Sequence, residues 1–263
     1  MTDLSKYGPW AVIAGGSEGV GAEFADQLAA AGLNLVLIAR KPEPLERTAA
    51  TCRAYGIQVR TLAADLTDPA ATDRIIGATA DLTVGLLIYN AGANTCSEEF
   101  LDADLADFAR VVELNINAPL RLVQHYGRPM RERRRGGILL VGSMAGYLGS
   151  VRHTIYGGAK AFGRIFAEGL WLELRDYNVD VLEVVLGVTR TPAMQRVGLN
   201  FDVPGMKVAE PAEVAAEGLE QLTRGPVHIA GGNAADVARR NNPDRAGVVL
   251  GTHRFMQQLI GQG

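Results

Sequence analysis

The stretch "AGGSEGVG", residues 14–21, joins the short apolar run "WAVIAG" (10–15) to a segment with helical periodicity. Gly15, Gly19 and Gly21 have the spacing G-x-x-x-G-x-G, which is wider than the common dinucleotide fingerprint G-x-G-x-x-G. The first glycine permits a tight turn, the second leaves the backbone open to a pyrophosphate, and the third lets the helix approach the sheet. The free N–H groups of the helix would face the phosphates. A plain strand-to-helix turn is the alternative interpretation.

Short β-branched runs alternate with longer helical patterns along the chain. Several runs are apolar nearly throughout, which is typical of strands buried on both faces of a parallel sheet. We predict one Rossmann-like, doubly wound α/β domain over residues 1–263, a seven-stranded parallel sheet in the order 3-2-1-4-5-6-7 with helices on both faces. The predicted strands are 10–15, 34–40, 58–65, 84–92, 137–143, 180–187 and 226–232.

Two segments depart from this alternation. Residues 188–210 form a long connection after the sixth strand, and connections of that length in a compact domain are usually functional. We therefore predict a substrate lid there. Residues 233–263 have the pattern of a helix, a break and a second helix, which predicts a C-terminal helical tail.

Composition excludes several classes of function. The 263 residues are 48% apolar and 21% charged, which favours a packed core, and the net charge of −3 offers no field for nucleic acid. The basic run at 131–135 is interpreted as a solvated helix end in preference to a polyanion site. There is no signal-peptide pattern and no apolar segment of 18 residues, so we expect no membrane span.

The two cysteines, Cys52 and Cys96, are isolated from each other. They predict neither a zinc site nor a disulfide framework, and we expect no metal. Free thiols fit a reducing compartment, so we expect a cytoplasmic protein.

Arg40, at the end of the second strand, bears on the choice of dinucleotide. An acidic residue there would bind a ribose 2′-hydroxyl, whereas an arginine accepts a 2′-phosphate. Arg40, followed by Lys41, therefore favours NADP(H) over NAD(H), and Ser17 can donate to the same phosphate. Glu18 in the glycine turn opposes this assignment, because a carboxylate repels a phosphate. A solvated arginine at a strand end is the alternative.

The pattern "Tyr156-Gly-Gly-Ala-Lys160" predicts acid–base chemistry. On a helix, residues i and i+4 share a face, so the phenol and the ammonium project together. A free tyrosine has a pKa of about 10, and a nearby cation lowers that pKa. Ser143 ends the fifth strand, where doubly wound folds bind their ligands. Asn115 lies in a helical stretch expected to stop or kink near Pro119.

Taken together, these residues resemble the short-chain dehydrogenase/reductase family. The resemblance covers residues 8–232, in the order and approximate spacing of the family. The matching residues besides the glycine turn are Asp65, "Asn90-Ala91-Gly92", Asn115, Ser143, Tyr156, Lys160, Gly187 and "Thr191-Pro192".

The resemblance implies an oxidoreductase that transfers hydride between nicotinamide C4 and a carbonyl or secondary alcohol carbon. It implies a catalytic tetrad in which Tyr156 is the general acid or base and Ser143 holds the carbonyl oxygen. Lys160 would lower the pKa of the tyrosine and bind the nicotinamide ribose, and Asn115 would fix a water that connects Lys160 to bulk solvent. The residues implied to bind the cofactor are Gly15, Ser17, Gly19, Val20, Gly21, Arg40, Asp65, Leu66, Asn90, Ala91, Gly92, Tyr156, Lys160, Val188 and Thr191.

Three positions depart from the family pattern. Ala14 stands where the family often has threonine, Tyr89 replaces the first asparagine of N-N-A-G, and Leu186 replaces the proline before Gly187. None of these changes removes a catalytic group. The first is expected to loosen the hydrogen bonding of the turn, and the last to alter how the lid leaves the sheet.

Other functions remain open from sequence. A cofactor-binding sensor or scaffold could keep the fold without catalysis, and an isomerase or dehydratase could share the tetrad. The apolar residues of the lid favour a lipophilic or acyl substrate, although they could equally pack the lid against the core. The long apolar helices at 104–135 and 156–177 predict a homodimer or homotetramer.

Overall fold

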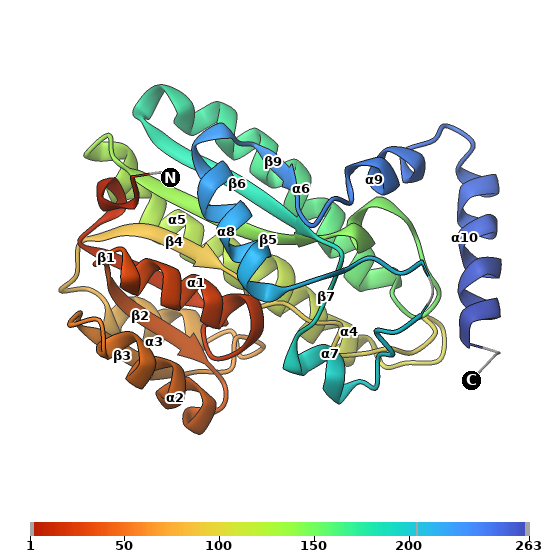
Figure 1. Cartoon of the computed structure of the whole chain (residues 1–263), viewed down its shortest axis with the longest axis horizontal. Coiled ribbons are helices and arrows are strands. Elements are labelled where there is room, and N and C mark those ends of the chain that lie inside the picture. Colours follow the sequence, from red (N-terminus) through yellow and green to blue (C-terminus); the bar gives the residue numbers. More distant parts are fainter. Residues whose placement is uncertain (1–2, 204, 261–263) are drawn as a thin grey trace.

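The computed structural model describes residues 3–203 and 205–260. Residues 1–2 and 261–263 of the predicted domain, the last three also in the predicted tail, and residue 204 of the predicted lid lie outside the described residues. Within the described part, seven strands form one parallel sheet in the order β3-β2-β1-β4-β5-β6-β9 (Figure 1), which confirms the predicted topology. The strands are β1 (Trp10–Ala14), β2 (Asn34–Ala39), β3 (Val59–Ala63), β4 (Val84–Tyr89), β5 (Gly136–Ser143), β6 (Val179–Leu186) and β9 (Val227–Ile229).

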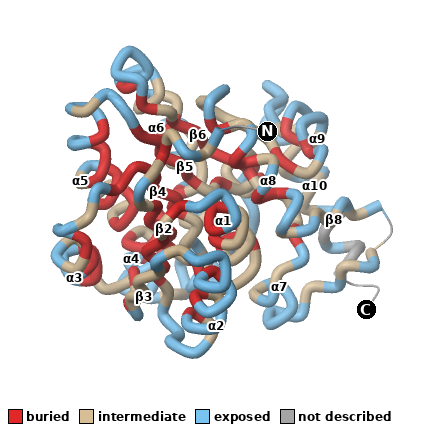
Figure 2. Tube along the Cα trace, turned by 60° about the vertical axis from the view of Figure 1, so that its left-hand side comes forward, coloured by how far each residue is buried: buried red, intermediate tan, exposed pale blue. Residues whose placement is uncertain are grey.

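Helices cover both faces of this sheet, as predicted (Figure 1). Both faces are apolar because alternate side chains of each strand enter opposite cores, as Ile13 and Val12 of β1 do. One core is completed by α1 (Gly19–Ala30), α2 (Pro42–Arg53) and α8 (Pro211–Gln221). The other is completed by α3 (Ala71–Ala78), α5 (Ala118–Glu132) and α6 (Thr154–Leu174). Figure 2 shows the buried residues concentrated in the strands and on the inner sides of these helices.

A five-residue π-helical segment interrupts the helical stretch after β4. It is η2 (Glu113–Asn117), and it joins α4 (Leu105–Val112) to α5. The predicted irregularity near Pro119 is therefore this π-helical segment, which ends two residues before Pro119, and Pro119 lies in the first turn of α5. The widened turn carries Asn115 instead, and π segments of this kind occur often at functional sites.

The connection 188–210, predicted as a lid, contains short regular elements. It contains β7 (Val188–Thr189), the short helix α7 (Pro192–Arg196) and β8 (Val208–Ala209), and β7 pairs in parallel with β8. This pairing ties the base of the segment together, while α7 and the residues after it stay largely exposed (Figure 2).

The C-terminal segment continues beyond the sheet as α9 (Ala234–Arg240) and α10 (Arg245–Ile260). Arg240 donates to the Met144 carbonyl oxygen and Arg245 to that of Tyr147, which attaches the segment to the loop after β5. Among the described residues, no helix has the length and apolarity needed to cross a bilayer. The remaining short helices are η1 (Leu4–Tyr7), η3 (Met144–Tyr147), η4 (Arg175–Tyr177) and η5 (Leu222–Arg224).

Candidate active site

The glycine turn after β1 has a conformation that other residues rarely adopt. Gly15 and Gly19 have φ values of +83° and +56°, in the left-handed region. A Cβ at Gly21 would lie 1.9 Å from the Gly15 carbonyl oxygen, so the helix meets the turn only because Gly21 has no side chain. That carbonyl also accepts a hydrogen bond of 2.8 Å from Asn90 Nδ2. The turn is thus held in place by a residue that follows β4, the neighbour of β1 in the sheet.

Glu18 precedes the first residue of α1 but does not cap it. Its side chain makes no capping hydrogen bond and pairs instead with Arg196 of α7, with 2.9 Å between Oε2 and Nη1 and a second contact through the other oxygen. The hydrogen bond from Arg196 holds the pKa of Glu18 below its usual range. The first N–H groups of α1 therefore face the turn without a side-chain cap, and the charge of Glu18 is matched by a cation from the lid.

The predicted cofactor contacts after β2 and β3 fall into two kinds. Arg40 is exposed, and Asp65 accepts hydrogen bonds from Thr67 through its N–H and hydroxyl groups at 3.0 and 2.9 Å. Val20 and Leu66 are each 4% exposed and belong to the two apolar cores. Their side chains face away from the edge of the sheet, so only their backbones are placed to contact a ligand there.

Gly92, after β4, lies at the meeting point of two predicted catalytic residues. A Cβ at this position would lie 2.8 Å from Lys160 Nζ and 3.0 Å from Asn115 Oδ1. The N–H groups of Asn90 and Ala91 both donate to the Ala14 carbonyl oxygen, at 2.9 and 2.8 Å, which fixes this loop against β1. The loop brings the lysine and the asparagine together across a backbone with no side chain between them.

Asn115 is positioned by the π segment. Its Nδ2 donates to the carbonyl oxygens of Ala93 and Val111, at 3.0 and 2.9 Å, while its Oδ1 is buried and has no hydrogen-bond partner among the described residues. Tyr89, which departs from the family pattern, donates to the Leu114 carbonyl oxygen at 2.7 Å. A buried amide oxygen without a partner needs a water or ligand donor.

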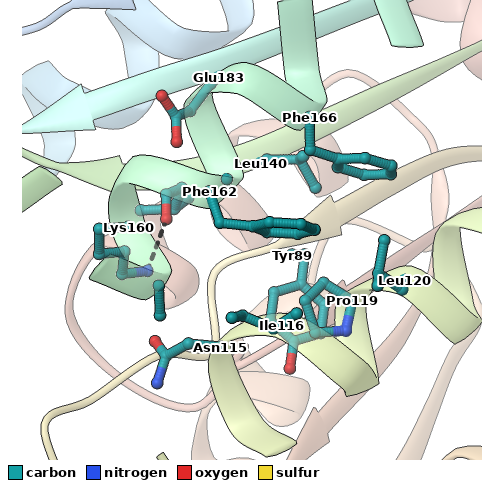
Figure 3. A pocket seen from close by; sticks show the side chains of 13 residues that line it. Tyr89, Asn115, Ile116, Pro119, Leu120, Leu140, Lys160, Phe162, Phe166 and Glu183 are labelled. Carbon is teal, nitrogen blue, oxygen red and sulfur yellow. Dashed lines mark hydrogen bonds between the residues drawn. The ribbon is translucent and has the colours of Figure 1, made fainter. Parts of the chain in front are cut away.

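Ser143 and Tyr156 lie on neighbouring elements at the same edge of the sheet. Ser143 ends β5, and its Oγ accepts a hydrogen bond of 3.1 Å from the Ala145 N–H. Tyr156 is in the first turn of α6 and Lys160 is one turn later, with Nζ 5.7 Å from the phenol ring centre. Lys160 Nζ also donates to the Val141 carbonyl oxygen at 3.0 Å (Figure 3). The ammonium is thereby held beside the tyrosine.

The lid segment places two further predicted residues. Thr191 caps α7 by accepting from the Met194 N–H at 3.3 Å, and its Cγ2 would lie 2.9 Å from a Cβ at Gly19. Val188 is half-buried in β7. Met194 and Val197 are 37% and 73% exposed, so these two lid side chains do not pack the segment to the core.

Two polar residues of the site were not singled out by sequence reasoning. Arg196 is one of the two arginines of the lid, and nothing in the sequence pairs it with Glu18. Glu183 lies in β6, is 2% exposed, and lines a cavity with Lys160 and Asn115 (Figure 3). A single carboxylate within the apolar run "VLEVVLG" (181–187) is the signal that would have found it. In the described part, no group of three His, Cys, Asp or Glu residues could hold a metal ion.

Comparisons with known proteins agree with this architecture. Residues 9–200 match the family model for short chain dehydrogenases. The chain is 30% identical over 243 residues to the 7beta-hydroxysteroid dehydrogenase of Clostridium sardiniense, covering 92% of this chain and 93% of the relative. It is 34% identical over 226 residues to a very-long-chain 3-oxoacyl-CoA reductase of Podospora anserina, covering 84% of this chain and 66% of the relative.

Solved structures give the same answer. A structure described in a study of 7beta-hydroxysteroid dehydrogenase stereoselectivity aligns with a TM-score of 0.86 and 29% identity, covering 95% of this chain and 98% of the other. A short-chain dehydrogenase from Sphingobium yanoikuyae in complex with NADPH aligns with a TM-score of 0.79 and 32% identity, covering 91% and 94%. The chain therefore belongs to the short-chain dehydrogenase/reductase family of oxidoreductases, which use a nicotinamide cofactor.

Proposed function

We propose that this protein is an NADP(H)-dependent oxidoreductase that transfers hydride between nicotinamide C4 and the carbonyl or secondary alcohol carbon of a small substrate. The observation that carries the proposal is that Lys160 Nζ and Asn115 Oδ1 both lie close to Gly92, and that Lys160 is one helical turn from Tyr156. This arrangement supplies a cation to tune a phenol and an unpartnered oxygen to bind a water.

The residues at the carboxyl edge of the sheet fit a dinucleotide. The turn at Gly15 and Gly19 presents backbone without side chains, and α1 offers uncapped N–H groups to a pyrophosphate. Asp65 would contact the adenine, and Asn90, which donates to the Gly15 carbonyl oxygen, would support the sheet beside the adenosine ribose. Thr191, across from Gly19, would contact a phosphate or the nicotinamide carboxamide. When bound, the nicotinamide supplies the hydride donor or acceptor.

The phosphorylated dinucleotide is favoured by charge. Arg40 is exposed and its charge acts on Glu18 of the turn, in which Ser17 also lies, so a 2′-phosphate would find both a cation and a hydroxyl donor. In the sequence, the Glu18 carboxylate opposed the choice of NADP(H), because it would repel the 2′-phosphate. Its pairing with Arg196 supports the choice, because the carboxylate is neutralised before a phosphate arrives.

The four side chains of the tetrad divide the proton chemistry. In carbonyl reduction Tyr156 donates its hydroxyl proton to the substrate oxygen, and Ser143 donates a hydrogen bond to the same oxygen. The Lys160 ammonium stabilises the tyrosinate that results. Asn115 holds a water through Oδ1, and this water returns a proton towards Lys160. In alcohol oxidation the same groups act in reverse.

The substrate class follows from the lid and from the relatives. The exposed Met194 and Val197 offer flexible apolar contacts to a lipophilic molecule. Relatives named for hydroxysteroids and for 3-oxoacyl-CoA point to an alicyclic ketone or an acyl chain. The segment 188–210 would close over such a substrate, which is consistent with its exposed helix α7.

We further propose a homo-oligomer built through α6. Phe162, Ile165 and Leu172 are 40%, 58% and 62% exposed and follow one another at helical spacing, so they form an apolar stripe on one face. The free, buried thiols of Cys52 and Cys96 fit the reducing cytoplasm that we propose as its location.

The experiment measures NADPH and NADH oxidation against alicyclic ketones and 3-oxoacyl thioesters, followed by loss of the absorbance of the reduced nicotinamide. The wild type is expected to turn over at least one ketone with NADPH. Tyr156→Phe is expected to lose about a hundredfold or more of that turnover. Tyr177→Phe, which removes a hydroxyl from an exposed tyrosine in η4, is the matched control and should keep it. Full turnover by Tyr156→Phe would contradict the assigned acid.

A further inference from the structure

Glu183 is a buried carboxyl group to which the reaction above assigns no role. It lies on the α6 side of β6, in the alternation occupied by Val181, and is 2% exposed. None of the described residues donates a hydrogen bond to its carboxylate. Burying a charged carboxylate without a partner on the apolar face of a strand lowers the stability of the fold by roughly several kcal/mol. Its position therefore calls for a partner.

The space that Glu183 occupies is left open by two glycines. A Cβ at Gly142 of β5 would lie 2.5 Å from Glu183 Cδ, and a Cβ at Gly163 of α6 would lie 3.2 Å from its Oε1. Gly142 directly follows Val141, whose carbonyl oxygen binds Lys160 Nζ at 3.0 Å. On β5, the Glu183 carboxylate therefore packs against the residue that follows Val141, the acceptor of the Lys160 hydrogen bond. On α6, it packs against Gly163, three residues after Lys160.

Glu183 and Lys160 both line a cavity of about 30 Å³, which has room for about two water molecules. Glu183, Lys160 and Asn115, whose buried Oδ1 has no hydrogen-bond partner among the described residues, all contribute side chains to its wall, as Figure 3 shows from close by. The rest of the lining is mostly apolar. Water in this cavity would have the lysine as donor and the two oxygens as acceptors, which is the number of polar partners a buried water needs.

We propose that Glu183 is a positioning residue that sets the charge facing Lys160 from the inner side of the site, opposite Tyr156. The proposal rests on the proposed function of Tyr156 and Lys160. A charged Glu183 offsets part of the positive field that Lys160 exerts on the phenol, whereas a neutral one leaves that field whole. The ionisation of Glu183 thereby controls how readily Tyr156 releases its proton.

The charges around Glu183 are compatible with this role. Burial raises its pKa to about 7, and Lys160 and Arg164 of α6 oppose that rise while Glu168 of the same helix adds to it. From η3, Tyr147 faces it as a neutral phenol whose own pKa is raised by burial. Asn115 of the π segment is uncharged. Glu183 therefore changes its charge near neutral pH.

The test measures the titration of Tyr156 in the full chain without cofactor or substrate. The ultraviolet difference between each protein and its Tyr156→Phe counterpart isolates the one phenol. Glu183→Gln is expected to lower the titration midpoint of Tyr156 by about half to one pH unit, because it removes a negative charge near the lysine. Glu168→Gln removes the same charge from a half-exposed site two turns along α6, and should shift the midpoint by less than about 0.2 units.

A midpoint in Glu183→Gln that differs from the wild type by no more than that of Glu168→Gln would overturn the proposal. If the glutamine variant does not fold, Glu183→Leu tests the same shift with an apolar side chain of similar size. An ordinary tyrosine midpoint in the wild type would count against the proposed function of Lys160. The difference between wild type and variant decides the role of Glu183 separately.

Discussion

Replacing Arg196 with glutamine removes the ion-pair partner of the Glu18 carboxylate in the glycine turn, where the more distant charges of Arg40 and Lys41 still act on it. The pair is partly exposed, 49% for the Arg196 side chain and 31% for that of Glu18, so its loss costs about 1 kcal/mol of stability or less. The effect on the cofactor is electrostatic. A carboxylate and a phosphate taken as about 7 Å apart repel by roughly 1 kcal/mol at an effective dielectric between those of the protein surface and water. That energy corresponds to about fivefold weaker binding of NADPH.

The assay is a fluorescence titration of NADPH at low salt with wild type, Arg196→Gln, Glu18→Gln and the double variant. Arg196→Gln is expected to bind about fivefold more weakly, and removal of Glu18 in the double variant is expected to restore the affinity to within about twofold. NADH lacks the 2′-phosphate and should be affected less. The reasoning is refuted if the loss persists in the double variant, or if NADH weakens as much as NADPH.

In Gly92→Ala, the new Cβ would lie 2.8 Å from Lys160 Nζ and would push the ammonium away. Turnover should therefore fall by about ten- to a hundredfold with little loss of stability. The control is Gly77→Ala, where a Cβ meets nothing within 4 Å, and it should retain full turnover. The pKa of Glu183 is raised from 4.5 to about 7, so the folded protein favours its neutral form and the wild type loses stability as the pH rises through that window. The free energy of unfolding of Glu183→Gln, from denaturant melts, should therefore rise by roughly 3 kcal/mol relative to wild type between these two pH values. Phe24→Ala, at a fully buried site between α1 and α8, should cost about 3–5 kcal/mol, and an unchanged unfolding midpoint would contradict the core described above.

The sheet was predictable because its strands are buried on both faces. Runs such as 34–40 and 137–143 carry no polar side chain between their end residues, and the observed strands β2 and β5 differ from them by a single residue. The predicted strand 84–92 was too long, since the chain leaves the sheet after Tyr89 to form the loop with Gly92. Apolar or small residues in a turn look like strand in the sequence, and only the hydrogen bonds show where pairing stops.

The parts of the site that escaped prediction depend on contacts distant in sequence. Glu18 and Arg196 are 178 residues apart, and no local pattern announces their pairing. Pro119 indicated an irregularity in this helical stretch, but the π-helical form of the segment at Asn115 could not be known before the backbone. The two-residue strands β7 and β8 are too short to leave a periodicity. The i, i+4 spacing of Tyr156 and Lys160, by contrast, is local, and their shared helix follows from it.

The most direct test of the central claim is deuteride transfer from NADPH that carries deuterium at the transferred position of nicotinamide C4. An alicyclic ketone turned over by the enzyme serves as acceptor, and mass spectrometry locates the label in the alcohol. We expect one deuterium on the carbinol carbon with wild type, formed about a hundredfold or more slowly by Tyr156→Phe. Tight binding of NADPH without labelled alcohol from a broad range of ketones would contradict the claim and favour a non-catalytic sensor.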